Sequence, residues 1–367
     1  MIASQPIAAR RTSFVYWIGL LVVVTLVFLL FLPKLHNFSR ATLPEMVYGT
    51  ADKPFAYRVL VPFTVRVLTP IFPVGEALID VPLVRERFID WRWETAYATE
   101  YVVAVVLLYA LWMGAAAAIG YMVASVYDHA IGFRNAAMIV TIFFVIPLWI
   151  RGYSNYLNDP ATLILFPVAI GLMARARWTV YGVVFVLATL NKETSILLTI
   201  LFCIYLWKTR TTIPFWRVLA AQVLIYGAIR ALLTLIFQAN GGFVMENHWD
   251  DNVARMAALV QSPLSLVLIA GLCVFVFYRW NEKPRVLRRA LWLIVPIFVL
   301  GMVSGVIDEF RIFYEVYPVI MALILHSAAR LIQIPLVVRQ PEGVIVYADG
   351  GLNDSLAASS APGSRMS

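Results

Sequence analysis

Charged residues are scarce in this sequence, and so are the side chains that form disulfides and zinc sites. Only 14% of its 367 residues are charged, whereas soluble domains carry roughly 25%. The two cysteines, Cys203 and Cys273, both lie in apolar segments, and the four histidines are far apart in the sequence. The low charge excludes an ordinary soluble domain. The cysteine and histidine usage excludes a disulfide framework, a zinc motif and thiol chemistry.

Hydrophobic residues make up 62% of the chain, which is typical of a polytopic membrane protein. A membrane-spanning helix needs about 20 predominantly apolar residues. We therefore expect an all-α integral membrane protein with about 10 transmembrane helices and no separate soluble catalytic domain. The candidate spans are residues 14–32, 99–122, 136–150, 160–174, 178–190, 195–207, 215–237, 263–279, 290–307 and 312–336.

The apolar segments divide the chain into three regions. Residues 1–13 are expected to form a cytoplasmic N-terminus, residues 14–336 a polytopic transmembrane domain, and residues 337–367 a cytoplasmic disordered tail of mostly small residues. The first apolar segment resembles a signal peptide at its start. Because it has no small-x-small cleavage site, we interpret it as a retained anchor.

The charges are distributed unevenly between the two sides of the predicted bundle. The net charge is +8, and many cations fall in alternate short loops, as the positive-inside rule expects of cytoplasmic loops. This rule explains the basic excess without nucleic-acid binding, and it predicts a multi-pass protein of the plasma (inner) membrane with both termini cytoplasmic. On that topology 16 of the 21 carboxylates lie on the outer face. They suggest a polar cavity at the outer helix ends, with ordinary solvated loops as the alternative.

The longest connection, residues 33–98, follows the first span and is too long for a simple connector. Within it, the stretch from Phe55 to Phe72 is apolar but interrupted by two arginines and two prolines, which favours an interfacial or re-entrant helix. The stretch from Val81 to Tyr97 mixes acids, arginines and tryptophans and suits the headgroup zone.

The first candidate site lies in this long outer loop. Glu45 and Asp52 are carboxylates that could act as a general base on an acceptor hydroxyl, and Arg58 could hold a phosphate at the membrane surface. The alternative is loop charge with headgroup anchoring.

Further candidates lie at other outer helix ends. Asp159 precedes Pro160 and either caps a helix or joins the outer-face charges. Lys192 and Glu193 lie between two short apolar segments, where they could bind a lipid phosphate and a substrate hydroxyl or form a tight loop. Arg230 is alone in an apolar segment and needs a carboxylate or an anionic substrate.

A fourth group of charges opens the last span. Asp308, Arg311 and Glu315 have the spacing that places three side chains on one helix face, and Glu309 lies beside them. They either bind substrate or form a salt-bridge ladder that satisfies itself. Glu315 lies inside the apolar segment and needs a buried partner.

A loop before the eighth span contains weak candidates for metal ligands. Glu246, His248, Asp250 and Asp251 offer oxygen and imidazole atoms suited to Mg, Mn or Ca. A divalent cation is the one cofactor that the sequence leaves open, and an ordinary polar loop is the alternative.

Three short motifs carry a family resemblance. They are the segment Pro-Phe-Ala-Tyr-Arg-Val-Leu-Val-Pro at residues 54–62, Lys-Glu-Thr at residues 192–194, and Glu-Phe-Arg at residues 309–311. The pattern resembles the polytopic membrane glycosyltransferases of the C-type fold (GT-C), and more closely a bacterial group with a Pro-Phe-x-Tyr-Arg-x-Leu-x-Pro loop. The similarity covers most of residues 14–336.

The resemblance implies an enzyme that transfers a hexosyl or pentosyl group from a polyprenyl-phosphate donor to an envelope acceptor (a glycan, lipid or protein) on the outer face. It places Asp52 or Glu45 in the acidic role, and Arg58, Lys192 and Arg311 at the donor phosphate. Many such enzymes carry two adjacent acids early in the loop, whereas Glu45 and Asp52 here are single and separate. The sequence therefore leaves open which carboxylate is the base.

Two other classes of function stay open at this level. One is a transporter or flippase of a lipid-linked or polar substrate, which predicts midplane charges and internal symmetry that the sequence does not display. The other is a non-catalytic membrane assembly protein. All three classes have membrane lipids as partners, and none involves nucleic acid.

Overall fold

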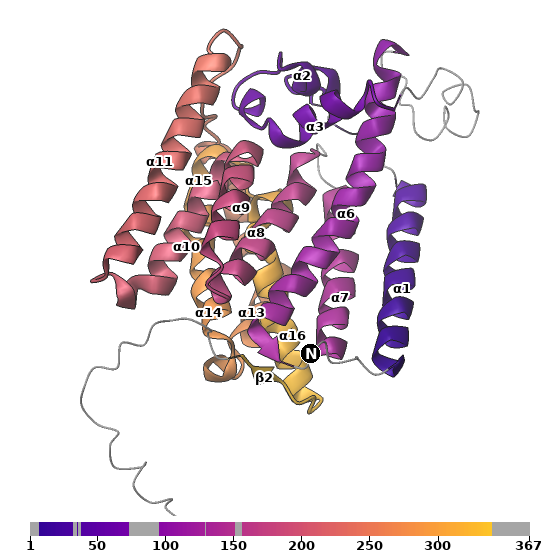
Figure 1. Ribbon diagram of the computed structural model, residues 1–367, viewed down its shortest axis with the longest axis vertical. Coiled ribbons are helices and arrows are strands. Elements are labelled where there is room, and N and C mark those ends of the chain that lie inside the picture. The colour runs from indigo at the N-terminus through magenta and orange to yellow at the C-terminus, as the bar shows by residue number, and fades with distance from the viewer. Residues whose placement is uncertain are drawn as a thin grey trace, which may run out of the picture.

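The computed structural model describes residues 7–31, 35, 38–72, 95–128, 130–150 and 156–339, which form an almost entirely helical bundle (Figure 1). The helices are α1 (Ile7–Phe31), α2 (Leu43–Tyr48), α3 (Leu60–Leu68), α6 (Ala98–Val126), α7 (Ile131–Ile150), α8 (Asn158–Ala174), α9 (Trp178–Asn191), α10 (Ile196–Leu206), α11 (Ile213–Ile236), α12 (Trp249–Gln261), α13 (Pro263–Phe277), α14 (Arg285–Ala290), α15 (Ile294–Ser304) and α16 (Tyr317–Leu331). The 3-10 turns are η1 (Phe55–Tyr57), η2 (Thr95–Tyr97), η3 (Glu193–Ser195), η4 (Trp207–Thr209), η5 (Trp280–Glu282), η6 (Leu291–Leu293) and η7 (Phe310–Phe313). Two short strands, β1 (Tyr127–Asp128) and β2 (Val337–Val338), pair antiparallel.

The helical fold class predicted from the sequence is confirmed. Each apolar segment found in the sequence contains a helix at similar bounds, because a backbone in an apolar environment must satisfy its hydrogen bonds internally. Within the described residues, three helical segments are long and apolar enough to cross a membrane: residues 98–126, 214–236 and 285–304. A fourth candidate is the pair α12 and α13 taken together, and the other apolar helices are shorter. The chain is thus an almost entirely helical protein with three or four candidate membrane-spanning segments among the described residues.

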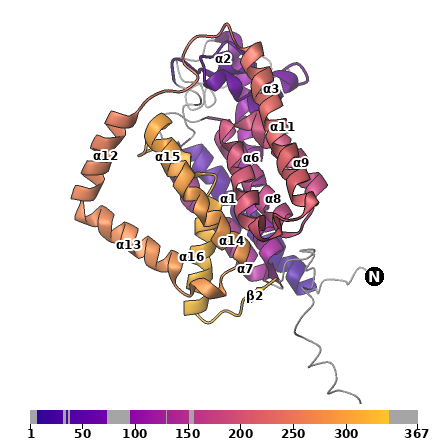
Figure 2. The same cartoon turned by 90° about the vertical axis from the view of Figure 1, so that its left-hand side faces the viewer.

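The axes of α12 and α13 differ by 87° across a single residue, Ser262. Pro263 causes this break because its ring removes a backbone donor and pushes the preceding residue toward extended conformations. Ser262 is extended and caps α13, with its hydroxyl accepting from the Ser265 amide at 3.3 Å. The bent pair lies to one side of the bundle, well apart from α1, α6 and α8 (Figure 2).

The core of the bundle lies around α6 and α8, which share the most extensive helix contact. Small residues allow this close approach: a Cβ atom on Gly171 would lie 2.7 Å from Cε1 of Tyr121. Trp112 on α6 and Phe166 on α8 are almost completely buried beside this contact.

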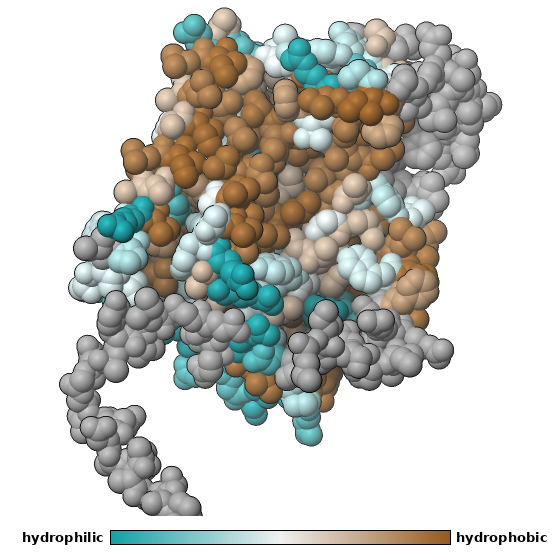
Figure 3. Space-filling view, viewed as in Figure 1, coloured by the Kyte–Doolittle hydropathy of each residue, from teal (hydrophilic) through white to brown (hydrophobic). Residues whose placement is uncertain are grey.

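Apolar side chains cover much of the outer surface, with polar residues gathered toward both ends (Figure 3). Helices α11 and α13 expose most of their residues, among them Leu224, Leu235, Leu264 and Val267. A soluble monomer does not leave so large an apolar surface in water, so these faces match the hydrocarbon of a bilayer.

Loops that alternate along the chain meet at the same end of the bundle. At one end, called here the β2 end, Arg339 pairs with Asp128, and Lys283 donates to the Leu323 carbonyl at 2.8 Å and to Ser327 at 2.8 Å. The opposite end, called the α2 end, carries α2 and α3 (Figure 1). This alternation is the one expected from the sequence.

Two local predictions need adjustment, and two others fall mostly on residues outside those that the structure describes. The stretch from Phe55 to Phe72 is not one helix, because η1 ends before Arg58 and α3 starts at Leu60. The supposed loop before the eighth span contains α12, whose amphipathic pattern is too polar to mark a span. The predicted headgroup segment from Val81 to Tyr97 lies outside the described residues up to residue 94, and the predicted tail lies outside them from residue 340.

Candidate functional site

A polar cleft of about 770 Å³, including its open mouth, lies at the α2 end. Three cations line it, namely Arg58, Lys192 and Arg311. Three carboxylates, Glu193, Glu246 and Glu309, line it together with His248. Ile297, Leu300 and Gly301 from α15 form an apolar wall. The three sequence motifs, which are far apart in the chain, therefore meet in one place.

Arg58 and Glu193 form the first ion pair of the cleft. Two nitrogens of Arg58 approach the carboxylate, Nη2 at 2.7 Å from Oε1 and Nε at 3.3 Å from Oε2. The Arg58 side chain is only 9% exposed, while Glu193 is 33% exposed. Burial alone would lower the pKa of Arg58, but the charge of Glu193 raises it above its ordinary value. Burial opposes ionisation of Glu193, yet Arg58 and Lys192 lower its pKa to about 2. Both groups are therefore ionised at neutral pH.

Lys192 and Glu315 form the second pair, in which Lys192 lines the cleft and Glu315 does not. Lys192 is extended and ends α9, and its Nζ lies 3.1 Å from Oε1 of Glu315. Glu315 is fully buried, and the Thr194 hydroxyl donates to the same oxygen at 2.5 Å. This pair supplies the buried partner that the sequence requires for Glu315. Its other oxygen, Oε2, has no hydrogen-bond partner among the described residues.

Arg311 forms the third pair, with Glu309, and its guanidinium lies 4.6 Å from the ring centroid of Tyr156. Asp159 lies behind it, at the start of α8, and is fully buried. Burial raises the pKa of Asp159, and the nearby charges of Arg311, Lys192 and Arg58 oppose that shift. Asp159 is not the cap of α8, because Leu157 occupies the N-cap position, and it lies instead among the charges at the α2 end. Its Oδ2 has no hydrogen-bond partner among the described residues.

The prediction that Asp308, Arg311 and Glu315 share one helix face is wrong. Residues 310–313 form the 3-10 turn η7, and α16 begins only at Tyr317, so the helical spacing does not apply. Asp308 pairs instead with Arg255 of α12, while Glu315 turns toward Lys192. These charges are not a self-satisfied ladder, because Asp308 and Glu315 find partners on other elements.

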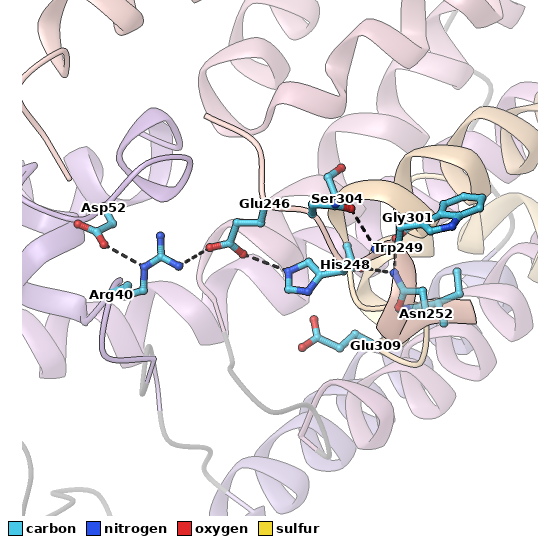
Figure 4. A network of polar contacts seen from close by, with 12 residues as sticks. Arg40, Asp52, Glu246, His248, Trp249, Asn252, Gly301, Ser304 and Glu309 are labelled. Carbon is cyan, nitrogen blue, oxygen red and sulfur yellow. Dashed lines mark hydrogen bonds and ion pairs between the residues drawn. The ribbon is translucent and has the colours of Figure 1, made fainter. Parts of the chain in front are cut away.

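A chain of ion pairs connects Asp52 with the cleft (Figure 4). Asp52 Oδ2 lies 2.9 Å from Nε of Arg40, and Nη1 of Arg40 lies 2.6 Å from Oε1 of Glu246. Glu246 Oε2 is in turn 3.3 Å from Nε2 of His248. Asp52 itself does not line the cleft and is connected to it through Arg40 and Glu246. Nothing in the sequence marks Arg40, which pairs across about 200 residues.

Two candidates from the sequence lie away from the cleft. Glu45 is at the third position of α2, where its carboxylate accepts from the Thr42 amide at 2.9 Å and completes a capping box. Arg230 on α11 stacks on the Tyr57 ring at 5.0 Å, and its Nη1 has no hydrogen-bond partner among the described residues. Neither residue lines the cleft.

The weak metal candidates are not brought together. Asp250 and Asp251 are exposed in the first turn of α12, where carboxylates stabilise a helix N-terminus. Only Glu246 and His248 are in contact. Across the described residues, no group of three His, Cys, Asp or Glu side chains could hold a metal ion.

Asn252 is a buried residue that sequence reasoning missed. Its Nδ2 donates to the carbonyls of Met302 at 3.0 Å and Gly305 at 2.7 Å, and its Oδ1 accepts from the Ile307 amide at 2.9 Å. These bonds satisfy carbonyls at the end of α15 and attach α12 to the wall of the cleft. A polar residue on a surface helix gives no sequence signal for this role.

The cations hold their carboxylates without using all their donors. Within the described residues, Arg311 donates to Glu309 through Nε alone, and Nη1 of Arg58 takes no part in the pair with Glu193. The cleft therefore has preorganised donors that could bind an anion, and carboxylates that could orient hydroxyl groups.

No family profile and no curated protein sequence matches this chain.

Proposed function

We propose that this protein is a membrane glycosyltransferase that moves a sugar from a polyprenyl-phosphate donor to an envelope acceptor. In this proposal the α2 end faces outside, about ten helical segments span the plasma membrane, and both termini are cytoplasmic. The observation that carries the proposal is the cleft itself, which combines three cations and three carboxylates with an apolar wall at the end of an apolar bundle.

Each part of the cleft matches a requirement of the reaction. Breaking the bond between a sugar and a lipid phosphate develops negative charge on the phosphate, and preorganised cations stabilise that charge. The free donors of Arg58 and Arg311 are the groups available for it. The carboxylates can accept from sugar hydroxyls. The apolar side chains of α15, including Leu300, lie where a lipid tail would leave the cleft for the bilayer.

The paired state of the cations supports this role. Long cationic side chains lose much rotamer freedom when they bind a ligand, and carboxylate pairs hold them in place beforehand. Equal numbers of cations and carboxylates also keep the empty site neutral, so it can stay folded beside a low-dielectric bilayer.

The test is release of polyprenyl phosphate from a panel of polyprenyl-phosphate sugars by the purified protein in lipid vesicles, with cell-envelope extract as the acceptor source. We expect release by the wild type and a loss on the order of 10²-fold in Arg311→Gln, because one charge-stabilising group is removed. Arg255→Gln is the matched control, since Arg255 pairs with Asp308 close by but does not line the cleft. Vesicle uptake of an intact lipid-linked sugar without release would contradict the proposal and favour a transporter.

A further inference from the structure

His248 lies at the rim of the cleft in a fixed position. Its backbone amide donates to the Val303 carbonyl at 2.8 Å, and its own carbonyl accepts from the Asn252 amide at 2.9 Å. It is thus held between α12 and α15. Its side chain is 28% exposed and lines the cleft, so a substrate hydroxyl can reach the imidazole.

The neighbouring carboxylate selects one form of the imidazole. Nε2 of His248 is 3.3 Å from Glu246, and a carboxylate only accepts hydrogen bonds. Neutral His248 therefore carries its proton on Nε2 and leaves a lone pair on Nδ1. Within the described residues, Nδ1 makes no hydrogen bond. Arg40 donates to Glu246 and also to Asp52. The imidazole is therefore oriented by the Glu246 carboxylate, and Arg40 and Asp52 hold that carboxylate in place.

The other carboxylates of the cleft are poorly suited to take a proton. Arg58 and Lys192 keep the pKa of Glu193 near 2, which makes it a weak base. Glu309 is engaged by Arg311 and is only 9% exposed. Asp52 does not line the cleft, and its Oδ2 accepts from Arg40. Among the described lining residues, the imidazole is thus the base whose second nitrogen no cation engages.

We propose that His248 is the general base of the transfer, with Glu246, Arg40 and Asp52 as positioning residues. This assignment rests on the proposed function and names the group that activates the acceptor, a hydroxyl compound. The acceptor oxygen forms a bond to the anomeric carbon of the sugar while the bond from that carbon to the phosphate oxygen breaks. The bonding electrons leave with the polyprenyl phosphate. The hydroxyl proton passes to Nδ1 of His248, and the resulting imidazolium is stabilised by Glu246.

The charged groups that line the cleft together with this imidazole come from several elements. Glu246 precedes it in the loop, Arg311 belongs to η7, and Glu309 directly precedes η7. Glu193 belongs to η3, Lys192 follows α9, and Arg58 follows η1. The three lining cations and the three lining carboxylates have no net charge together. An imidazolium formed in the reaction is therefore stabilised mainly by Glu246, the carboxylate that it contacts.

The test compares His248→Gln, His248→Ala and Glu246→Gln with wild-type protein in the donor-release assay, and measures donor binding separately. We expect His248→Gln to reduce turnover on the order of 10²-fold or more with unchanged donor affinity. Added imidazole should restore part of the activity of His248→Ala. Asp308→Asn is the matched charge control, because Asp308 lies near the cleft but outside its lining, and it should keep wild-type turnover.

A spectroscopic readout tests the positioning role of Glu246. Nitrogen-15 spectra of histidine-labelled protein should show His248 with its proton on Nε2, and Glu246→Gln should mix the two neutral forms, because an amide can donate as well as accept. Wild-type donor release that persists in His248→Gln would overturn the base assignment and leave the proposed function standing. A wild-type protein that releases no polyprenyl phosphate would overturn both.

Discussion

Replacing Lys192 by Met leaves the fully buried Glu315 carboxylate without its cation. Two charges 3.1 Å apart attract each other by roughly 5 kcal/mol at an effective dielectric of about 20, before desolvation is counted. Removing one partner of a buried pair costs about 3–5 kcal/mol, because the remaining charge stays buried. The Thr194 hydroxyl continues to donate to Glu315, so we expect the lower end of that range for Lys192→Met.

The double variant separates the pair from its individual residues. Glu315→Gln should cost less than Lys192→Met, because the Lys192 side chain is 10% exposed and lines the cleft, toward which its ammonium can turn. Combining Lys192→Met with Glu315→Gln removes both charges and should recover about 2 kcal/mol of the summed losses. The assay is reversible unfolding in mixed micelles, and Lys53→Met is the control because Lys53 is partly exposed and, within the described residues, its ammonium donates to the Gln238 carbonyl and forms no ion pair. Strictly additive losses, or a Lys192→Met loss below about 0.5 kcal/mol, would refute the buried pair.

Two other predictions concern packing and pH. A Cβ atom on Gly171 would lie 2.7 Å from the Tyr121 ring, so Gly171→Ala should lower the unfolding free energy by about 1–3 kcal/mol in the same assay. The control is Gly182→Ala, which should be neutral or stabilising because a Cβ atom there has nothing within 4 Å. Equal effects at both positions would contradict the tight contact between α6 and α8. The pKa of Glu193 is lowered to about 2, so its stabilisation is present above the ordinary glutamate pKa and is lost as pH falls toward 2. Since a third of the side chain is exposed, we expect about 1–2 kcal/mol from this group. Acid titration of Glu193→Gln should lack that part of the pH dependence, and a variant with the wild-type slope would contradict the assignment.

The fold was largely predictable because apolar segments identify helices regardless of their partners. The meeting of Arg58, Lys192 and Arg311 was also predictable, since alternate loops of an up-and-down bundle share an end. Which carboxylate pairs with which cation could not be predicted from the sequence. Arg40 reaches Glu246 across about 200 residues, and no local pattern reports such a contact.

Local geometry caused the remaining errors. The helical spacing of Asp308, Arg311 and Glu315 failed because the backbone there is a 3-10 turn, in which side chains follow a different period. The helix α12 was missed because its polar first turn resembles a loop. The 3-10 turn lies at the cleft, where it places Arg311 in the lining, and α12 lies beside the cleft, attached to α15 through Asn252.

The most direct test of the central claim is photolabelling of the protein in vesicles with a polyprenyl-phosphate sugar that carries a photoreactive group near its phosphate. We expect labelled peptides from residues 54–62, 192–194 and 309–311, with labelling reduced by free polyprenyl phosphate and by Arg311→Gln. Labelling confined to the β2 end, or labelling of the cleft that free polyprenyl phosphate does not reduce, would contradict a donor site at the α2 end.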